Sequence, residues 1–326
     1  MELKKTGPAA GRWASIVRWF DNELPVADAT DGGGAQGIDW PRVLPFVAMH
    51  LGCFAVIWVG VSTTAVLIAA GLYALRMFAI TGFYHRYFAH CAFRTSRVMQ
   101  FLFAVLGASS VQRGALWWAS HHRHHHAHSD QPADAHSARQ HGFFWSHMGW
   151  FMARENFATR REWVGRLSRF PELRFLDRYD TLVPAVLALA LYAAGEVLAA
   201  YAPGLGASGL QLLVWGFCIS TVALHHATFT INSLSHRFGR RRYATNDDSR
   251  NNVWLALLTF GEGWHNNHHH FPGAARQGFY WWEIDLTYYG LRLLAALGLI
   301  WDLREIPATL RDARRVAAAD APGRRS

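Results

Sequence analysis

The sequence predicts an all-α integral membrane protein, with four transmembrane helices in two hairpins and a cytoplasmic helical cap. Apolar blocks over residues 45–61, 65–84, 182–202 and 210–231 each approach the ~20 residues that a helix needs to cross a bilayer. Hydrophobic residues make up 51% of the 326 positions, yet the mean hydropathy is only +0.02. The apolar residues are therefore concentrated in these blocks, and the rest of the chain is polar and basic.

Short connections pair the four blocks into two hairpins. A Ser/Thr turn separates the first two blocks, and the Gly-rich segment Pro203–Gly209 separates the last two. Neither connection contains Lys or Arg, whereas the N-terminus, residues 84–181 and the tail after 231 contain nearly all of them. By the positive-inside rule these three regions face the cytoplasm. We therefore expect a multi-pass protein of the cytoplasmic membrane, with an N-terminal segment (1–42), one membrane domain (43–304) and a tail (305–326).

Histidines gather in three short clusters: His85–His90, His122–His126 and His265–His269. Neutral imidazole is a common protein ligand for transition metals. Eight imidazoles in these spacings exceed the four ligands of a single zinc ion. The count therefore indicates two metal ions, and all three clusters fall on the predicted cytoplasmic side.

Spacing indicates how the rings are arranged. His122, His125 and His126 stand at i, i+3, i+4, where they share one helix face, and His265, His268 and His269 repeat the pattern. His85 and His90 are about 140° apart on an ideal helix, so we expect them to straddle two metals or a helix end. The register of the second cluster stays open, because His121, His124 and His125 have the same spacing.

A quieter pair, Asn232 and His236, lies where the last block enters the cytoplasm. Alone it would be a surface or capping pair; beside three clusters on the same side, we interpret His236 as a further ligand. The competing interpretation of the clusters is a solvent-exposed metal-binding tract. That alternative does not predict the same spacing in a second cluster 140 residues later.

Two other apolar stretches are not expected to span. Val98–Ala119 contains Gln112 and Arg113, and a crossing there would put the first two clusters on opposite faces, so we place it as an interfacial or buried cytoplasmic helix. Gly142–Ala153 looks interfacial by its tryptophans. For Arg76, inside the second block, we favour snorkelling to the interface over a polar contact within the bundle.

These residues resemble the membrane fatty-acyl desaturase family, specifically its stearoyl-CoA (Δ9 acyl-CoA) branch. The HxxxxH, HxxHH and HxxHH boxes match the three clusters, and the flanks around Gly142–Trp150, Arg174–Arg178, Asn232–His236 and Phe260–His269 favour that branch. The resemblance implies two irons and resolves the register. Its implied metal ligands are His85, His90, His122, His125, His126, His236, His265, His268 and His269, with Asn232 acting through water.

The resemblance also implies a kinked acyl tunnel. Gln112, Trp118 and Thr228 match positions that shape the kink, and Tyr73 and Met77 match its far end. Met77 is bulkier than the residue typical of the long-chain enzymes, so we expect a shorter tunnel. We name Arg113 and Arg154 as candidates for holding the phosphates of the acyl carrier.

The implied activity is O2-dependent insertion of a cis double bond, at Δ9, into a saturated acyl-CoA. Breaking unactivated C–H bonds needs a redox-active metal centre, which Zn²⁺ cannot supply. Because no haem, flavin or ferredoxin motif is visible, electrons must come from a cytochrome b5-like, ferredoxin or rubredoxin-type partner. The alternatives are a membrane hydroxylase of acyl chains or alkanes, and a metal-binding or transport protein. The net charge of +9 is not accompanied by a nucleic-acid-binding signature.

Overall fold

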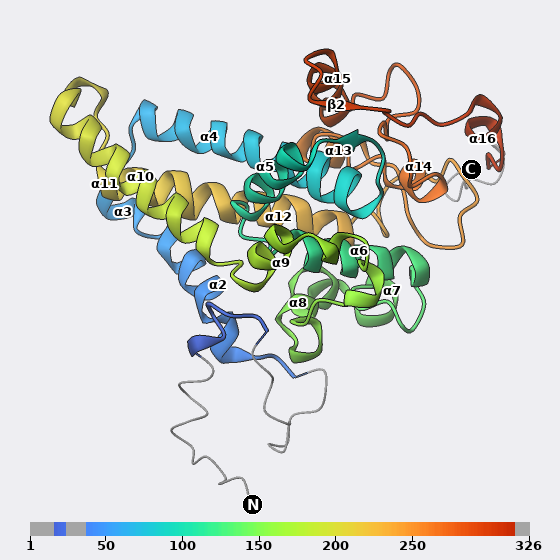
Figure 1. Cartoon of the computed structure of the whole chain (residues 1–326), viewed down its shortest axis with the longest axis horizontal. Coiled ribbons are helices and arrows are strands. Elements are labelled where there is room, and N and C mark those ends of the chain that lie inside the picture. The colour runs from blue at the N-terminus through green and yellow to red at the C-terminus, as the bar shows by residue number, and fades with distance from the viewer. Residues whose placement is uncertain (1–15, 24–36, 317–326) are drawn as a thin grey trace, which may run out of the picture.

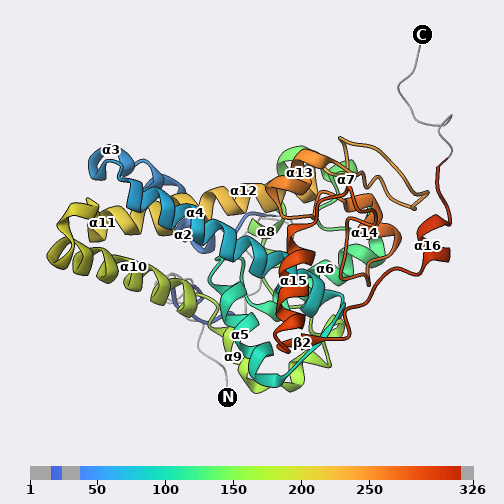
Figure 2. The ribbon, with the colours of Figure 1, turned by 90° about the horizontal axis from the view of Figure 1, so that it is seen from above.

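A computed structural model describes residues 16–23 and 37–316, and it has two parts (Figure 1). Long helices with α3 and α11 at their tips extend to one side, and a cap of short helices and loops forms the other (Figure 2). Within the described residues, four helical runs are long and apolar enough to cross a membrane: Trp40–Val59, Thr63–Ala89, Leu182–Tyr201 and Gly209–Ser233. The predicted all-α membrane fold is therefore confirmed. Most of the predicted N-terminal segment and the end of the tail lie outside the described residues.

The first hairpin comprises α2 (Trp40–Cys53) with α3 (Val56–Val59), and α4 (Thr63–Phe78) continued by the π-helix η1 (Ala79–Ala89). Asp39 caps α2 by accepting a hydrogen bond from Arg42 N, and Ser62 caps α4 by accepting one from Ala65 N. Gly60 ends α3 with a φ of 68°, a value that glycine adopts without strain. The turn therefore reverses the chain within a few residues.

The second hairpin comprises α10 (Leu182–Tyr201), then η6 (Pro203–Leu205), α11 (Gly209–Leu212), the π-helix η7 (Leu213–Ile219) and α12 (Ser220–Ser233). Its two arms touch at glycines: a Cβ atom on Gly195 would lie 2.4 Å from the carbonyl oxygen of Ser208. Small residues allow this close backbone approach between membrane helices.

The cap is built on α5 (Arg97–Ala108) and α6 (Ala115–His128). As predicted, the stretch 98–119 does not span: α5 has only 12 residues, and a break before α6 contains Val111 and Arg113 with positive φ. The remaining elements are short. They are β1 (Arg94–Thr95), α7 (Ala138–His141), η2 (Trp145–Gly149), α8 (Trp150–Met152), η3 (Arg154–Asn156), η4 (Arg161–Trp163), η5 (Leu167–Arg169), α9 (Pro171–Arg178), α13 (Val253–Leu258), α14 (His265–His270), α15 (Leu286–Ala296), β2 (Ile300–Trp301) and α16 (Ala308–Asp312).

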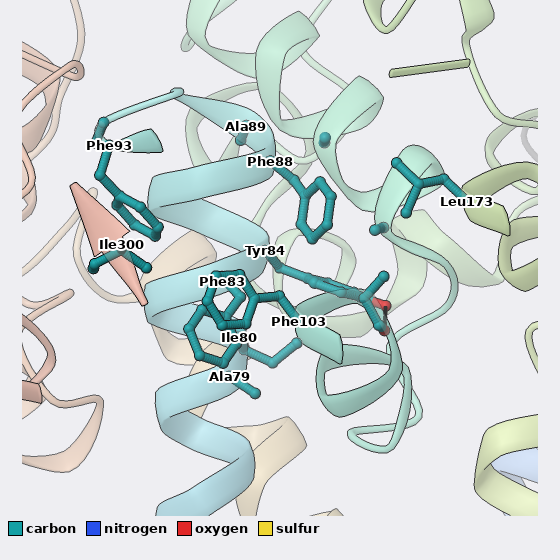
Figure 3. Packing of buried hydrophobic residues seen from close by; sticks show 14 of the residues in the cluster. Ala79, Ile80, Phe83, Tyr84, Phe88, Ala89, Phe93, Phe103, Leu173 and Ile300 are labelled. Carbon is teal, nitrogen blue, oxygen red and sulfur yellow. Dashed lines mark hydrogen bonds between the residues drawn. The ribbon is translucent and has the colours of Figure 1, made fainter. Parts of the chain in front are cut away.

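An aromatic core joins η1 to the cap (Figure 3). Phe83 stacks on Phe103 with ring centroids 3.7 Å apart. Tyr84 is fully buried, and its ring lies so close to Gly107 that a Cβ atom there would be 2.0 Å away. This packing fixes η1, and with it the first histidine cluster, against α5 and α6.

Two placements differ from the sequence-based expectation. Arg76 does not snorkel: its side chain is 1% exposed and donates to Ser109 O, Thr221 Oγ1 and Ser220 Oγ, among others. The other interpretation, a polar contact within the bundle, therefore describes Arg76, because five neutral acceptors surround its guanidinium group. Trp150 is also buried rather than interfacial, stacked on Trp117 with centroids 5.6 Å apart.

Candidate metal centre

All nine histidines of the predicted ligand set lie in two adjacent groups. In each group, one nitrogen from every ring lies within 4.8 Å of those of the others. Group one contains His85, His90, His122, His126 and His268, and group two contains His125, His236, His265 and His269. The structure places His121 and His124 outside both groups: His121 Nε2 faces Ala158 O, and the His124 ring packs on His128.

Each HxxHH cluster is divided between the groups. On α6, His122 and His126 belong to group one and His125 to group two; on α14, His268 belongs to group one, and His265 and His269 to group two. The three positions of each cluster share one helix face, as their spacing predicts, but their rings do not all belong to one group. In both helices the rings of residues i and i+4 belong to the same group, and the ring of residue i+3 belongs to the other group.

The π-helix η1 explains how His85 and His90 share a group. His90 N donates to His85 O, an i+5 to i hydrogen bond of 3.2 Å. This wider turn places residue i+5 above residue i. Their predicted separation by about 140° assumed an ideal α-helix. The two rings lie in one group rather than in two, and the alternative that we gave, a position across a helix end, agrees with the structure, because η1 ends at Ala89 and His90 is its C-cap residue.

Carboxylates hold the outer nitrogens of four of these histidines. Nδ1 of His125 lies 2.9 Å from Asp134, Nδ1 of His236 lies 2.8 Å from Asp130, and Nδ1 of His269 lies 2.7 Å from Asp247. Glu262 pairs with Nδ1 of His85. A ring that donates from Nδ1 keeps the Nε2 lone pair free, which is how carboxylates orient metal-binding histidines.

The inner nitrogens converge. Nε2 atoms lie 3.1 Å apart between His85 and His268, and 2.9 Å apart between His268 and His126. In group two, the Nε2 atoms of His236 and His265 lie 3.0 Å apart, and Nε2 of His269 has no hydrogen-bond partner among the described residues. Buried acceptors that point at one another without donors fit a shared cation.

Electrostatics keep most of these rings neutral. Burial, reinforced by neighbouring imidazoles, holds the pKa of His90, His122, His126, His265 and His268 well below the usual histidine value. Burial also lowers the pKa of His125, but the Asp134 carboxylate more than offsets this and the net direction is upward. Neutral imidazole is the metal-binding form, so the donor set fits iron and comparable transition metals.

A cavity of about 340 Å³ leads to this centre. Its walls include Gln112, Arg113, Trp118 and Thr228 from the predicted substrate set, together with His122 and Asn232. Gln112 donates to Thr228 Oγ1 at 2.8 Å, and Trp118 Nε1 donates to Gln112 Oε1 at 3.4 Å. The three predicted kink residues therefore form one hydrogen-bonded unit in the cavity wall.

A smaller cavity of about 50 Å³ continues beneath the histidines. It shares Trp118, His122, Thr228 and Asn232 with the larger cavity and adds residues such as Ile80, Thr81 and Thr259. The two cavities therefore share a wall, and Thr228 in that wall accepts the hydrogen bond from Gln112.

Three predicted substrate contacts line neither cavity: Tyr73, Met77 and Arg154. Met77 is fully buried one turn before Thr81, which donates to its carbonyl oxygen, and Tyr73 donates to Leu258 O. Met77 therefore lies just beyond the wall of the small cavity. Arg154 lies on the short helix η3, between the lining residues Met152 and Phe157 of the large cavity, but it lines neither cavity itself.

Sequence reasoning missed the N-terminal segment 16–23, which forms part of the large cavity through Arg18, Trp19 and Asn22. Asn22 Nδ2 donates to Asp177 O, and its Oδ1 accepts from both Arg42 and Arg113. No local pattern identifies these contacts, because their partners lie 20 to 155 residues away. The four carboxylates could have been suspected, since Asp130 and Asp134 directly follow the second histidine cluster.

Comparison with known proteins agrees with this geometry. Residues 44–300 match the family model described as fatty acid desaturase. The chain belongs to this family. It is a desaturase-family membrane protein, and its desaturase relatives indicate an oxidoreductase.

Individual relatives of this desaturase-family chain differ in acyl carrier and position. It is 37% identical over 294 residues to a chloroplastic palmitoyl-monogalactosyldiacylglycerol delta-7 desaturase of Arabidopsis thaliana, covering 87% of this chain and 74% of the relative. It is 36% identical over 270 residues to an sn-1 stearoyl-lipid 9-desaturase of Anabaena variabilis, covering 82% and 94%. An acyl-CoA 5-desaturase of Anemone leveillei is 34% identical over 296 residues, covering 87% and 86%.

Proposed function

We propose that this protein inserts a cis double bond, at Δ9, into a saturated acyl-CoA in an O2-dependent reaction at two iron ions. The observation that supports this most directly is the pair of buried histidine groups beside an apolar cavity. The nine histidines would hold the ions, and Asn232 would act through water. When bound, the irons supply the oxidising power that removes hydrogens from an alkyl chain.

The residues of the chain provide orientation and a dry environment. Asp130, Asp134, Asp247 and Glu262 hold Nδ1 of their histidines, which leaves Nε2 directed inward. The cavity would bind the acyl chain, and the Gln112–Thr228 hydrogen bond would bend it beneath the histidines. Regioselectivity then follows from position, because the wall fixes which two methylenes lie at the centre.

An anionic acyl carrier is consistent with the charge of the cavity wall. Arg18, Arg42 and Arg113 line the large cavity, against one carboxylate, Asp180. Acyl-CoA has phosphates that such a surface attracts, whereas a galactolipid headgroup is neutral. By the positive-inside rule we place the cap, with the opening of the large cavity, in the cytoplasm. The acyl carrier, O2 and an electron donor protein would then all arrive from that side.

The experiment is product analysis of the purified protein with iron, a reductase system, O2 and either stearoyl-CoA or stearoyl-galactolipid. Mass spectrometry with double-bond location is expected to show a cis Δ9 alkene from the CoA ester. A hydroxy-acyl product would support the hydroxylase alternative, and an alkene formed only from lipid would exclude acyl-CoA. His268→Ala is expected to abolish the product, and full activity in that variant would contradict the metal assignment.

A further inference from the structure

The surface segments 237–251 and 304–316 form one arginine-rich region, which we call the arginine face. Their backbones pair: Ala244 N donates to Arg314 O, and Val316 N donates to Arg242 O. Three guanidinium groups surround the Tyr280 ring, those of Arg242, Arg311 and Arg315, at 4.7 to 5.7 Å from its centroid. The two segments contain nine arginines and four carboxylates, so the face is strongly positive.

The arginine face covers histidine group two closely. Asp247, on this face, accepts a hydrogen bond from His269 at 2.7 Å, and its side chain is 10% exposed. The neighbouring Asp248 N donates to Asp130, which holds His236. His270, next to His269, stacks on Tyr243 at 4.0 Å. A single hydrogen bond therefore separates the solvent-exposed loop from an imidazole of the centre.

The position of the face excludes the bilayer as its partner. α14 and α16 lie at the opposite end of the molecule from the hairpin tips at α3 and α11 (Figures 1 and 2). A membrane that surrounds the hairpins cannot reach that end. A second basic region on 154–178 lies beside the large cavity and α9, nearer the spans, so it is the region placed for headgroups and acyl carriers.

We propose that the arginine face is the docking surface for an acidic one-electron carrier protein. The proposal rests on the proposed function, which requires electrons from outside the chain. Each turnover removes two hydrogens from the acyl chain, takes up two protons and reduces one O2 to two waters. Two electrons must therefore enter, one from each of two reduced carriers, which leave oxidised. Electron-transfer contacts of this kind are small and depend on complementary charge.

The first test measures the Kd of a plant-type [2Fe–2S] ferredoxin, an acidic carrier, for the detergent-solubilised full chain. The double variant Arg240→Glu/Arg314→Glu changes two exposed side chains of the face. At low ionic strength we expect about tenfold weaker binding, because reversed charges oppose the encounter. The difference should disappear near 1 M salt, where the Debye length is about 3 Å. Arg166→Glu/Arg169→Glu, in the second basic region, is the matched control and should bind as the wild type does.

A second measurement separates this proposal from the proposed function. After reduction by dithionite, a single turnover with stearoyl-CoA should give equal alkene in the wild type and in Arg240→Glu/Arg314→Glu, whereas ferredoxin-supported turnover should fall in that double variant. No alkene from dithionite-reduced wild type would overturn the proposed function. An unchanged ferredoxin Kd in the double variant would overturn the docking surface. Native mass spectrometry could instead show that Arg240→Glu/Arg314→Glu loses bound phosphatidylglycerol but still binds ferredoxin. That result would make the arginine face a lipid site and would also overturn the proposed docking surface.

Discussion

At the scale of single residues, the carboxylates around the histidines decide which nitrogen faces inward. His269 illustrates this: Nδ1 lies 2.7 Å from Asp247, and Nε2 has no hydrogen-bond partner within residues 16–23 and 37–316. Burial raises the pKa of Asp247, but the His269 imidazole and nearby Ser249 lower it by more, so the carboxylate stays ionised. Mutation of a carboxylate that holds a metal-binding histidine typically lowers metal affinity or activity by about 10- to 100-fold.

Asp247→Asn is therefore expected to lower iron affinity by about 10- to 100-fold, because the amide cannot hold Nδ1 of His269 by charge. Iron per protein, measured by mass spectrometry after dialysis against a weak chelator, checks this. Asp248→Asn is the control, since that side chain makes only an ion pair with Arg139 at 3.8 Å. Wild-type iron retention in Asp247→Asn would contradict the orienting role.

Met77 supports a second prediction at this scale. It is fully buried beside Leu224 and Ala227, just beyond the small cavity. Met77→Ala is expected to lengthen that cavity and shift the products toward longer acyl chains, measured by gas chromatography of a mixed acyl pool. The variant should also lose about 2–5 kcal/mol of stability, as buried truncations do. Met99→Ala, in the separate core around η1, is the control for a general loss of packing and should leave the chain-length profile unchanged. An unchanged profile in Met77→Ala would contradict the prediction that Met77 lies at the end of the acyl tunnel.

At the scale of elements, the π-helix η1 and the α-helices α6 and α14 together form the two groups. η1 brings residues i and i+5 into line, while α6 and α14 each send i+3 to the other group. A 3.6-residue period places residues i, i+3 and i+4 on one face, but it does not align residues i and i+5. The spacing of the first box therefore depends on a particular hydrogen-bond register, held by aromatic packing on α5 and α6.

Inserting one alanine between Arg86 and Tyr87 is expected to rotate His90 away from His85 by about 80–100°. Group one would then lose a nitrogen, and the iron content should fall by about half or more, since the remaining imidazoles must fill the site. The matched control is one alanine inserted after Gly204, in the hairpin tip, where a Cβ atom meets nothing within 4 Å. Two irons retained in the first variant would show that the register does not matter.

Hydropathy predicted the four spans, and the spacing of the histidines predicted that three clusters come together. The full set of nine histidines came from the family resemblance, because spacing left the register of the second cluster open. The cytoplasmic side of the cap stays a prediction from the charge pattern. The π-helix was missed because its register is set by packing of Phe83 and Tyr84 rather than by a local signal. The contribution of Trp19 and Asn22 to the cavity was missed because their contacts join distant parts of the chain.

At the scale of the whole molecule, the hairpins and the cap separate two environments. The hairpin tips end at α3 and α11, and the arginine face and both histidine groups lie in or beside the cap. This arrangement agrees with the proposed cytoplasmic location of the centre, because almost all positive charge lies on the cap side.

Cysteine labelling tests that orientation. In a Cys91→Ser background, which removes the exposed native thiol, we expect a cysteine at Arg314 to react with an impermeant maleimide only in inside-out vesicles. A cysteine at Gly204, in the connection between α10 and α11, should react only in right-side-out vesicles. The reverse pattern would place the centre on the other side of the membrane.

Arg76 has a consequence for how the chain enters the membrane during synthesis. An arginine at the centre of a span costs about 2.5–3.5 kcal/mol on translocon-insertion scales. Three of its five hydrogen-bond acceptors are on Gly216, Ser220 and Thr221, in the fourth span, and so emerge from the ribosome about 140 residues later. Until the second hairpin arrives, the guanidinium of Arg76 therefore has only the carbonyl oxygens of Leu72 and Ser109 among these acceptors. Stable integration of the second span is consequently a late event of biogenesis, completed only when the two hairpins meet.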